Sequence, residues 1–378
     1  MKTITHLILF CAFWSTNGVA DNRILPLETG LTLAEVVNGV HRHTIAVFSD
    51  TGETIKGYNL SEHFQQPLAP IELYSQQGYE SLRRAIRQAD KNSLQDYAYN
   101  ELLSPAGDAQ HHFAAGLNYA DHADEVDAEA QPFIFLKTTK ATRNQPISYH
   151  AERLLDYEVE ICARPLSEIS NANVSEHDFG YFLCGDFTDR ASLLRNIDLD
   201  YMQTGKGFSQ SKSPDTYFPT GPYLFIPKPD TQLLNTLMLE LSVNDQQKQL
   251  SSASALIWSM PRIVEEIFQA HQERRDTHSD ITQQWLKNNT LNSQSSILTG
   301  TPDGVIMAPP SLSYKITRGI SYVLTGAIFS DQYRSVREYV VSRYIKDLLD
   351  SNTFLKPGDS VSLSATGLGS LVIDITSP

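Results

Sequence analysis

Three features are scarce in this 378-residue sequence: cysteine, positive charge and long apolar runs. Three cysteines occur, of which two lie beyond the first twenty residues, so a disulfide-rich framework is excluded. Lysine and arginine number 30 against 44 acidic residues, a formal net charge of −14, which argues against nucleic acid as a partner. No later apolar run approaches the roughly 20 residues that a membrane-spanning helix needs.

The first twenty residues, "MKTITHLILFCAFWSTNGVA", have the layout of a secretory signal peptide. Lys2 precedes an apolar run from Leu7 to Trp14, and small residues lead to Ala20. We expect cleavage after Ala20, a periplasmic or secreted location, and no membrane association afterwards. A retained anchor is the alternative, which the shortness of the apolar run disfavours.

Residues 21–110 mix short β-like runs with a helical segment in which Leu82, Ala85, Ile86 and Ala89 recur at helical spacing, and predict a small N-terminal domain. Across residues 111–378, short apolar runs alternate with turn signals. This pattern predicts a mixed α+β, β-rich roll or sandwich. Two segments interrupt it: a polar stretch over 268–296, expected at the surface, and an amphipathic helix near 336–349, expected to pack on the domain or on a partner subunit.

The stretch "LDYEVEICARP" at 155–165 reads as a buried strand that carries two carboxylates on one face. Side chains alternate along a strand, so Glu158 and Glu160 point the same way while Val159 and Ile161 point the other. Two buried like charges repel unless a cation lies between them, and a divalent ion is the simplest candidate. An exposed acidic pair is the alternative.

Other polar residues fit around such an ion. Asp186 ends the next apolar run, "LCGDFTDR", and offers a third carboxylate. His122 and Glu125, three residues apart in "GLNYADHADE", are neighbours on a helical turn and form a general-base pair or a surface pair. Lys212 and Thr301 lie in Pro/Gly-rich loops that allow close approach to a ligand, or that are simply turns.

Cys162 follows Glu160 by two residues, and Cys184 precedes Asp186 by two. Both therefore share the acidic face if their strands are neighbours. We expect two buried free thiols, since cysteine is among the most buried residue types, with a disulfide as the alternative.

Taken in order, eight segments resemble the catalytic domain of the fumarylacetoacetate hydrolase superfamily, which includes acylpyruvases and 2-hydroxyhepta-2,4-diene-1,7-dioate isomerases. They are "GLNYADHADE", "PFIFLK", "LDYEVE", "GDFTDR", "KSPDTYFPTGPYL", "VND" with "QLSSAS", "ILTGTPDGV" and "LKPGDSVSLSATGLGSL". The resemblance covers about residues 113–375. It departs from the family pattern in "GDFTDRA", where Asp189 adds a charge, and at Pro214 in "KSPDT".

The resemblance implies roles for particular residues. Glu158, Glu160 and Asp186 would bind Mg²⁺ or Mn²⁺, and His122 with Glu125 would activate water. Lys212 would contact the substrate's oxo acid or a developing oxyanion. Lys137, Arg190 and Thr301 would contribute to substrate binding.

The resemblance further implies a divalent-metal-dependent hydrolase, commonly a homodimer, that cleaves a C–C bond in an acylpyruvate-like 2,4-dioxo acid. Alternatives are a decarboxylase, isomerase or hydratase of a related 2-oxo acid, because the same stabilisation of negative charge serves each reaction. A non-catalytic carboxylate-binding relative is a further alternative.

Overall fold

The computed structural model describes residues 24–125, 131–143, 145–170, 174–198, 201, 204–229, 231–276, 285–330 and 332–378. The predicted signal peptide at 1–20 lies outside these ranges. In the ranges given, no helix combines the length and apolarity needed to cross a membrane.

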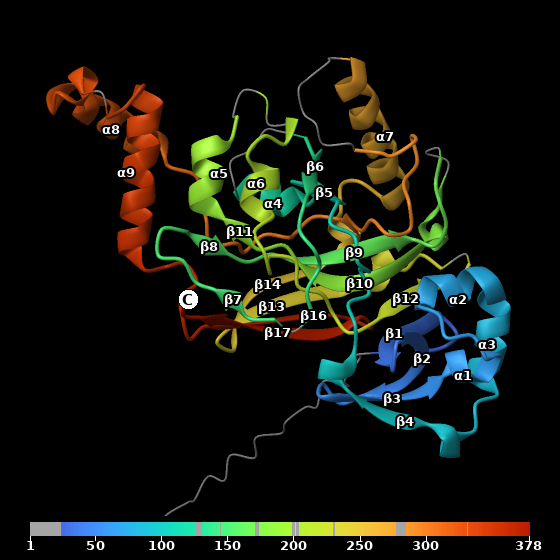
Figure 1. Cartoon of the computed structure of the whole chain (residues 1–378). Coiled ribbons are helices and arrows are strands. Elements are labelled where there is room, and N and C mark those ends of the chain that lie inside the picture. The colour runs from blue at the N-terminus through green and yellow to red at the C-terminus, as the bar shows by residue number, and fades with distance from the viewer. Residues whose placement is uncertain are drawn as a thin grey trace, which may run out of the picture.

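One large sheet organises the molecule (Figure 1). Its ten strands, counted over the described residues, lie in the order β4 (Gln95–Ala98), β3 (Thr54–Asn59), β2 (His41–Asp50), β1 (Gly30–Asn38), β12 (Leu224–Pro227), β10 (Phe179–Gly185), β9 (Val159–Pro165), β15 (Ile297–Leu298), β5 (His112–Gly116) and β6 (Phe133–Lys137). A mixed α+β, β-rich fold is therefore confirmed.

The N-terminal segment extends this sheet. β1 pairs antiparallel with β12, with Leu33 opposite Leu224. Helices α1 (Leu60–Phe64) and α2 (Pro70–Gln77) pack on the segment's own strands, and α3 (Tyr79–Arg87) packs on these two helices. Leu82, Ala85 and Ile86 of α3 are buried, as their spacing predicts. A boundary between two domains at residue 110 stays a prediction. In the structure, strand β1 of the N-terminal segment hydrogen-bonds to β12, so the large sheet includes strands from both sides of residue 110.

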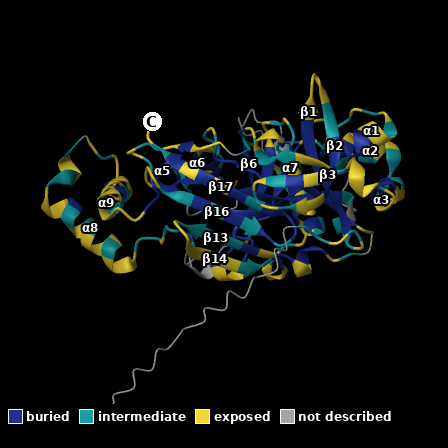
Figure 2. Cartoon of the chain, turned by 90° about the horizontal axis from the view of Figure 1, so that it is seen from below, coloured by how far each residue is buried: buried dark blue, intermediate teal, exposed yellow. Residues whose placement is uncertain are grey.

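A smaller sheet packs on one face of the large one. Its strands are β14 (Gln246–Ser252), β13 (Met238–Val243), β16 (Ser360–Ala365), β17 (Gly369–Thr376) and β7 (Ile147–Ser148). Apolar side chains of β9 and β10 meet those of β13, β16 and β17 in a shared core. Figure 2 colours buried residues dark blue, and many of them lie near the centre of the view. This packing is a sandwich of two sheets.

Alternation along β9 separates the core from the site. Val159, Ile161 and Ala163 belong to the core between the sheets, and each larger side chain contributes roughly 1.5–3 kcal/mol through burial. Glu160 and Cys162 therefore point to the opposite face of the large sheet. That face is covered by α4 (Ala120–Glu125), α5 (Arg190–Asn196) and α6 (Phe208–Lys212). Helix α7 (Met260–Asp276) instead packs into the core cluster that contains Val159 and Ile161.

The polar stretch at 268–296 was predicted to be a surface excursion, and this is wrong in part. Residues 268–276 complete α7, whose Ile263, Val264 and Ile267 lie in the core. Trp285 and Leu286, which belong to the same polar stretch, are also buried in this core. Polar composition hid these contacts because the apolar residues of α7 lie in its first half, outside the stretch.

Helices α8 (Leu312–Leu324) and α9 (Val336–Ser351) form an arm beside α5 (Figure 1). In α9, Tyr339 and Ile345 are buried, as the predicted amphipathic stripe requires, but Val336 and Leu349 on that stripe are exposed. α8 packs on α9 through Tyr322 and Tyr339, whose ring centroids lie 5.4 Å apart. Much of the apolar surface of α8 is exposed.

Candidate metal centre and cavity

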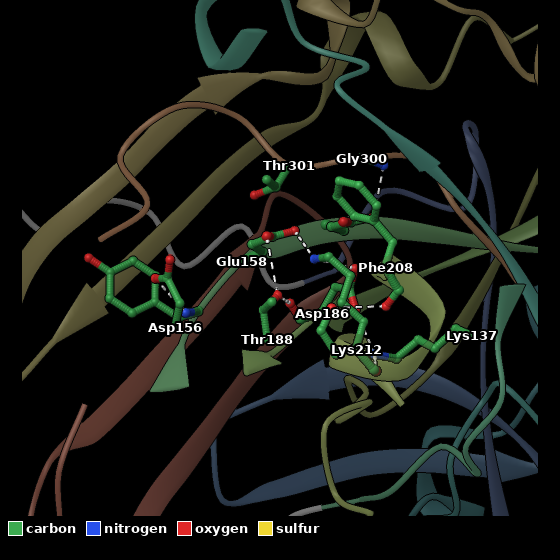
Figure 3. A network of polar contacts seen from close by, with 12 residues as sticks. Lys137, Asp156, Glu158, Asp186, Thr188, Phe208, Lys212, Gly300 and Thr301 are labelled. Atoms are coloured by element: carbon green, nitrogen blue, oxygen red, sulfur yellow. Dashed lines mark hydrogen bonds and ion pairs between the residues drawn. The ribbon is translucent and has the colours of Figure 1, made fainter. Parts of the chain in front are cut away.

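The structure brings Glu158, Glu160 and Asp186 together. One carboxylate oxygen from each lies within 4.8 Å of the others, a spacing suited to one metal ion. The three residues are 4%, 2% and 1% exposed. Glu158 directly precedes β9, Glu160 is the second residue of that strand, and Asp186 directly follows β10. Figure 3 shows Glu158 and Asp186.

Strand register explains the clustering. β9 and β10 pair antiparallel with Gly185 opposite Val159, so the end of β10 lies beside the beginning of β9. The Asp186 N–H donates to the Glu158 carbonyl at 3.0 Å and continues this pairing. Carboxylates far apart in sequence therefore share one edge of the sheet.

The predicted strand over 155–165 is interrupted. β8 (Leu155–Asp156) pairs with β11 (Thr188–Asp189) in a separate two-stranded sheet, and β9 begins only at Val159. Side chains replace the missing ladder bonds: the Tyr157 N–H donates to Asp156 Oδ1 at 2.9 Å, and the Val159 N–H donates to Gln249 Oε1 at 3.0 Å. The bend leaves the two glutamates on one side of the chain.

Two lysines neutralise part of this negative charge. Lys212 Nζ lies 2.7 Å from Glu158 Oε2 and 2.8 Å from Asp186 Oδ2, the second an ion pair without hydrogen-bond geometry. Lys137 Nζ donates to Asp186 Oδ1 at 2.5 Å and to the Lys212 carbonyl. Lys137 is fully buried beneath Asp186, a candidate metal ligand, and is not among the residues that line the cavity described below. Its role in substrate binding stays a prediction.

Arg190 bridges two acids from the first position of α5. Its Nη2 donates to Glu158 Oε1 and its Nε to Asp156 Oδ2, both at 2.8 Å. Asp156 also accepts the Ile306 N–H at 2.9 Å. Asp189, the departure from the family pattern, caps the same helix by accepting the Ser192 N–H at 3.0 Å.

The electrostatics of the three carboxylates fit a cation. Burial raises the pKa of Glu160 well above its usual value, and Asp186 and Glu158 raise it further. Burial also acts to raise the pKa of Asp186, but Lys137 and Lys212 bring it below its ordinary value. Glu160 is thus the acid least compensated by the protein, and a divalent ion beside it would hold it ionised.

Gly300 and Thr301 approach the carboxylates from above (Figure 3). The Gly300 N–H donates to Glu160 Oε2 at 2.8 Å, at a φ of 103° that favours glycine. The Thr301 hydroxyl donates to the Val159 carbonyl and accepts from Gln249 Nε2, each at 3.0 Å. To donate to a substrate carboxylate, Thr301 would have to release Val159.

His122 is buried on α4 and lines the same cavity as the three carboxylates. The backbone of Glu125 ends α4, but its side chain lies outside the described residues, so the predicted pair stays a prediction. Asn118, just before this helix, ties it to two other segments by donating to the Thr299 carbonyl at 2.8 Å and accepting the Trp258 N–H at 2.7 Å.

Sequence reasoning missed two supporting residues. Asp156 orients Arg190, and Gln249 links the start of β9 to the Thr301 loop through its Thr301 and Pro302 contacts. Asp156 lies two residues before Glu158 in "LDYEVE", so alternation along a strand could have placed it on the same face as the two glutamates. Gln249 lies in a strand of the smaller sheet, and only tertiary structure brings it here.

Cys162 and Cys184 form a disulfide between β9 and β10. Their burial is confirmed, but the prediction of free thiols is wrong. Antiparallel register places Cys184 opposite Glu160, so the two cysteines are diagonal neighbours on the acidic face with Cα atoms 5.9 Å apart, within bonding range. The disulfide links the two strands that carry the candidate ligands.

All three carboxylates form part of the floor of a cavity of about 730 Å³. His122, Arg190, Lys212 and Thr301 also line it. Apolar side chains from α5, α6 and α9 form much of the remaining wall.

Fold and site together define a β-rich protein with a buried carboxylate centre suited to a divalent cation. The model of the fumarylacetoacetate (FAA) hydrolase C-terminal domain matches residues 111–376, and the chain belongs to this family. The resemblance predicted from eight segments is confirmed. Residues 24–110 lie outside the matched region.

Curated relatives cover about half of this chain. Oxaloacetate tautomerase YisK of Bacillus subtilis (strain 168) is 32% identical over 201 residues, which are 50% of this chain and 58% of that protein. Mitochondrial oxaloacetate tautomerase FAHD1 of Bos taurus is 29% identical over 218 residues, 56% of this chain and 86% of that protein. Mitochondrial oxaloacetate decarboxylase of Dictyostelium discoideum is 32% identical over 203 residues, which are 51% of this chain and 81% of that protein.

Solved structures share the fold at lower identity. A fumarylacetoacetate hydrolase from psychrophilic Exiguobacterium antarcticum superimposes with a TM-score of 0.57 at 18% identity, covering 92% of this chain and 100% of that one. The 2-hydroxyhepta-2,4-diene-1,7-dioate isomerase from Mycobacterium marinum gives 0.52 at 18% identity, covering 92% and 98%.

Proposed function

We propose that this protein is a divalent-metal-dependent hydrolase that cleaves a C–C bond in an acylpyruvate-like 2,4-dioxo acid. One observation carries the proposal: three buried carboxylates converge within 4.8 Å at the floor of a cavity that His122 and Lys212 also line. Mg²⁺ and Mn²⁺ both suit an all-carboxylate donor set.

The charge balance favours an anionic substrate. Within the described part of the chain, Asp156, Glu158, Glu160 and Asp186 are buried beside three buried cations, Lys137, Arg190 and Lys212. With all seven ionised the cluster carries one net negative charge, and a divalent ion would make it positive. A 2-oxo acid carries the complementary charge.

When bound, the ion supplies Lewis-acid stabilisation of the negative charge that develops on the oxo acid. His122 takes a proton from a water molecule, which attacks the acyl carbonyl carbon. The C–C bond to the pyruvate part breaks, its electron pair stays on that part, and the proton returns there from His122. The products are a carboxylic acid and pyruvate.

The cations have separate roles in this scheme. Lys212, at the cavity surface, stabilises an oxyanion, while Arg190 fixes the orientation of Glu158. Lys137 acts as a positioning residue for Asp186, because it is enclosed beneath that carboxylate.

Tautomerisation or decarboxylation of oxaloacetate is the second candidate, favoured by the names of the curated relatives. These reactions need the same stabilisation of negative charge but no attacking water. The role of His122 therefore separates the candidates.

The test is turnover by the purified protein with Mg²⁺ or Mn²⁺. We expect loss of the enol absorbance of acetylpyruvate, formation of acetate and pyruvate, and abolition by EDTA. Full activity in EDTA contradicts the proposal. Oxaloacetate conversion without acylpyruvate cleavage favours the second candidate.

An exported location and a homodimer also remain proposals. The Cys162–Cys184 disulfide supports an oxidising compartment, since such bonds are rare in the cytosol. Exposed apolar residues of α8, among them Ile316 and Ile320, support a partner contact. Cell fractionation and analytical ultracentrifugation test the two.

A further inference from the structure

The cavity extends far beyond its charged floor. Its volume of about 730 Å³ lies in the upper part of the range typical of pockets for drug-sized ligands, roughly 300–1,000 Å³. The three carboxylates, Arg190 and Lys212 lie together in one region of the lining. A four-carbon oxo acid at the floor would leave most of this space to water.

Two helices supply a large part of the apolar wall away from the floor, and Lys315 and Arg337 also lie on this lining. α5 and α9 lie side by side in the arm region of Figure 1. Their contributions to the lining are Leu193, Leu194, Ile197, Val336, Val340 and Val341. Val336 and Val340, four residues apart, lie on the same side of α9, and Val336 is 47% exposed.

This wall is fixed relative to the floor. Ile345, lower on α9, is buried in a cluster with Leu154, Ala191 and Phe354. At the other end of the wall, Arg337 Nη2 donates to the Ile197 carbonyl at the end of α5. α5 begins at Arg190, which contacts Glu158 on the floor, so the apolar wall and the charged centre share one helix.

We propose that the wall formed by α5 and α9 binds an apolar acyl chain, so that the protein acts on 2-oxo acids carrying a chain of several carbons rather than on four-carbon acids. The inference rests on the proposed function in placing the oxo-acid end at the floor. The chain then covers valines that water otherwise contacts. Each methylene that becomes buried should strengthen binding about fourfold.

The test is calorimetric titration of the Mn²⁺-loaded protein with straight-chain 2-oxo acids of increasing length, repeated without metal. We expect Kd to fall about fourfold for each added methylene until the cavity is filled. An affinity that does not depend on chain length, with and without metal, overturns the proposal.

Two variants locate the effect. In Val340→Asn and Val336→Asn, the affinity ratio between a long and a short 2-oxo acid should fall about tenfold, because a polar amide faces the chain. Val336 is exposed, so its substitution does not endanger folding. Val323→Asn is the matched control: this valine, 57% exposed on α8, does not line the cavity, and the ratio should stay unchanged.

Failure of this inference is distinguishable from failure of the proposed function. A rise of affinity with chain length without acylpyruvate cleavage upholds the apolar wall and contradicts only the hydrolase assignment. Cleavage of acetylpyruvate with no preference for chain length upholds the hydrolase assignment and contradicts the role of the apolar wall. Tighter binding of an ω-carboxylate than of its alkyl analogue would mean that Lys315 and Arg337, also on the lining, decide selectivity, and overturns the proposal.

Discussion

The floor of the cavity and its α9 wall are held in different ways. Glu158, Glu160 and Asp186 are at most 4% exposed and are fixed by neighbouring strands, ion pairs and a disulfide. Val336 on the wall is 47% exposed and belongs to a helical arm that contacts the body through a small cluster around Ile345 and through Arg337. Charged groups stabilise a transition state strongly only where they are held rigidly and water is excluded. Selection of an apolar substrate requires only an apolar surface of suitable size.

The difference predicts that substitutions at the floor change turnover of every substrate, whereas those at the wall change the choice among substrates. Of the four experiments below, the first two test the floor and the last two test the stability of the large sheet, in order of decreasing effect.

Glu160→Gln should have the largest effect. It removes a ligand charge from the centre while keeping the shape, so we expect turnover to fall about a thousandfold, roughly 4 kcal/mol of lost transition-state stabilisation. Mn²⁺ affinity, measured by calorimetry, should fall with it. Glu168→Gln, at an exposed carboxylate just after β9, is the control. Equal turnover in both variants would remove the metal centre from the mechanism.

His122→Asn should lower hydrolysis by about 10²–10⁴-fold, the usual contribution of a general base. Mn²⁺ binding should persist, because the carboxylates are untouched. Steady-state kinetics with acetylpyruvate and with oxaloacetate measure the effect. If the variant still converts oxaloacetate but no longer hydrolyses acetylpyruvate, His122 activates water. If both activities fall equally, His122 transfers protons in both reactions.

Joint replacement of Cys162 and Cys184 by serine should lower the free energy of unfolding by about 3 kcal/mol, since the disulfide closes a loop with a sequence separation of 22. Urea denaturation with and without a reductant measures this. The reductant should destabilise the parent protein and leave the double variant unchanged. No shift in either would show that β9 and β10 hold the floor without the covalent link.

The pH dependence of stability should reveal His112 on β5. Burial lowers its pKa to about 3, and its neutral ring accepts the Ser296 N–H at Nδ1 while Nε2 donates to the Ala109 carbonyl. The unfolded histidine binds a proton below about pH 6.5, so the free energy of unfolding falls as pH drops through the window from 6.5 to 3.

From pH 7.5 to pH 5, this histidine should account for about 2 kcal/mol of lost stability. Urea unfolding of His112→Gln at both values should show a smaller loss than the parent protein. Identical losses would mean that other groups account for the acid sensitivity.

Much of the floor could be predicted from sequence. Alternation in "EVEICA" fixes which side chains share a face, and the antiparallel neighbour "LCGDF" carries its acid and cysteine with matching parity. The interruption at Tyr157 could not be predicted, because it depends on Gln249 reaching Val159 from another sheet. The long helix α7 was missed because its polar second half masked its apolar first turns.

The sequence by itself therefore determined the strand faces, through alternation over a few residues, and the family and candidate ligands, through short motifs that recur in a fixed order along the chain. Tertiary structure alone decided that Lys137 contacts Asp186 from beneath, that the two cysteines pair, and that α9 completes the cavity beside α5. These arrangements join segments tens of residues apart. They depend on burial, on charge pairing and on a covalent bond between distant segments of the folded chain, which no local pattern encodes.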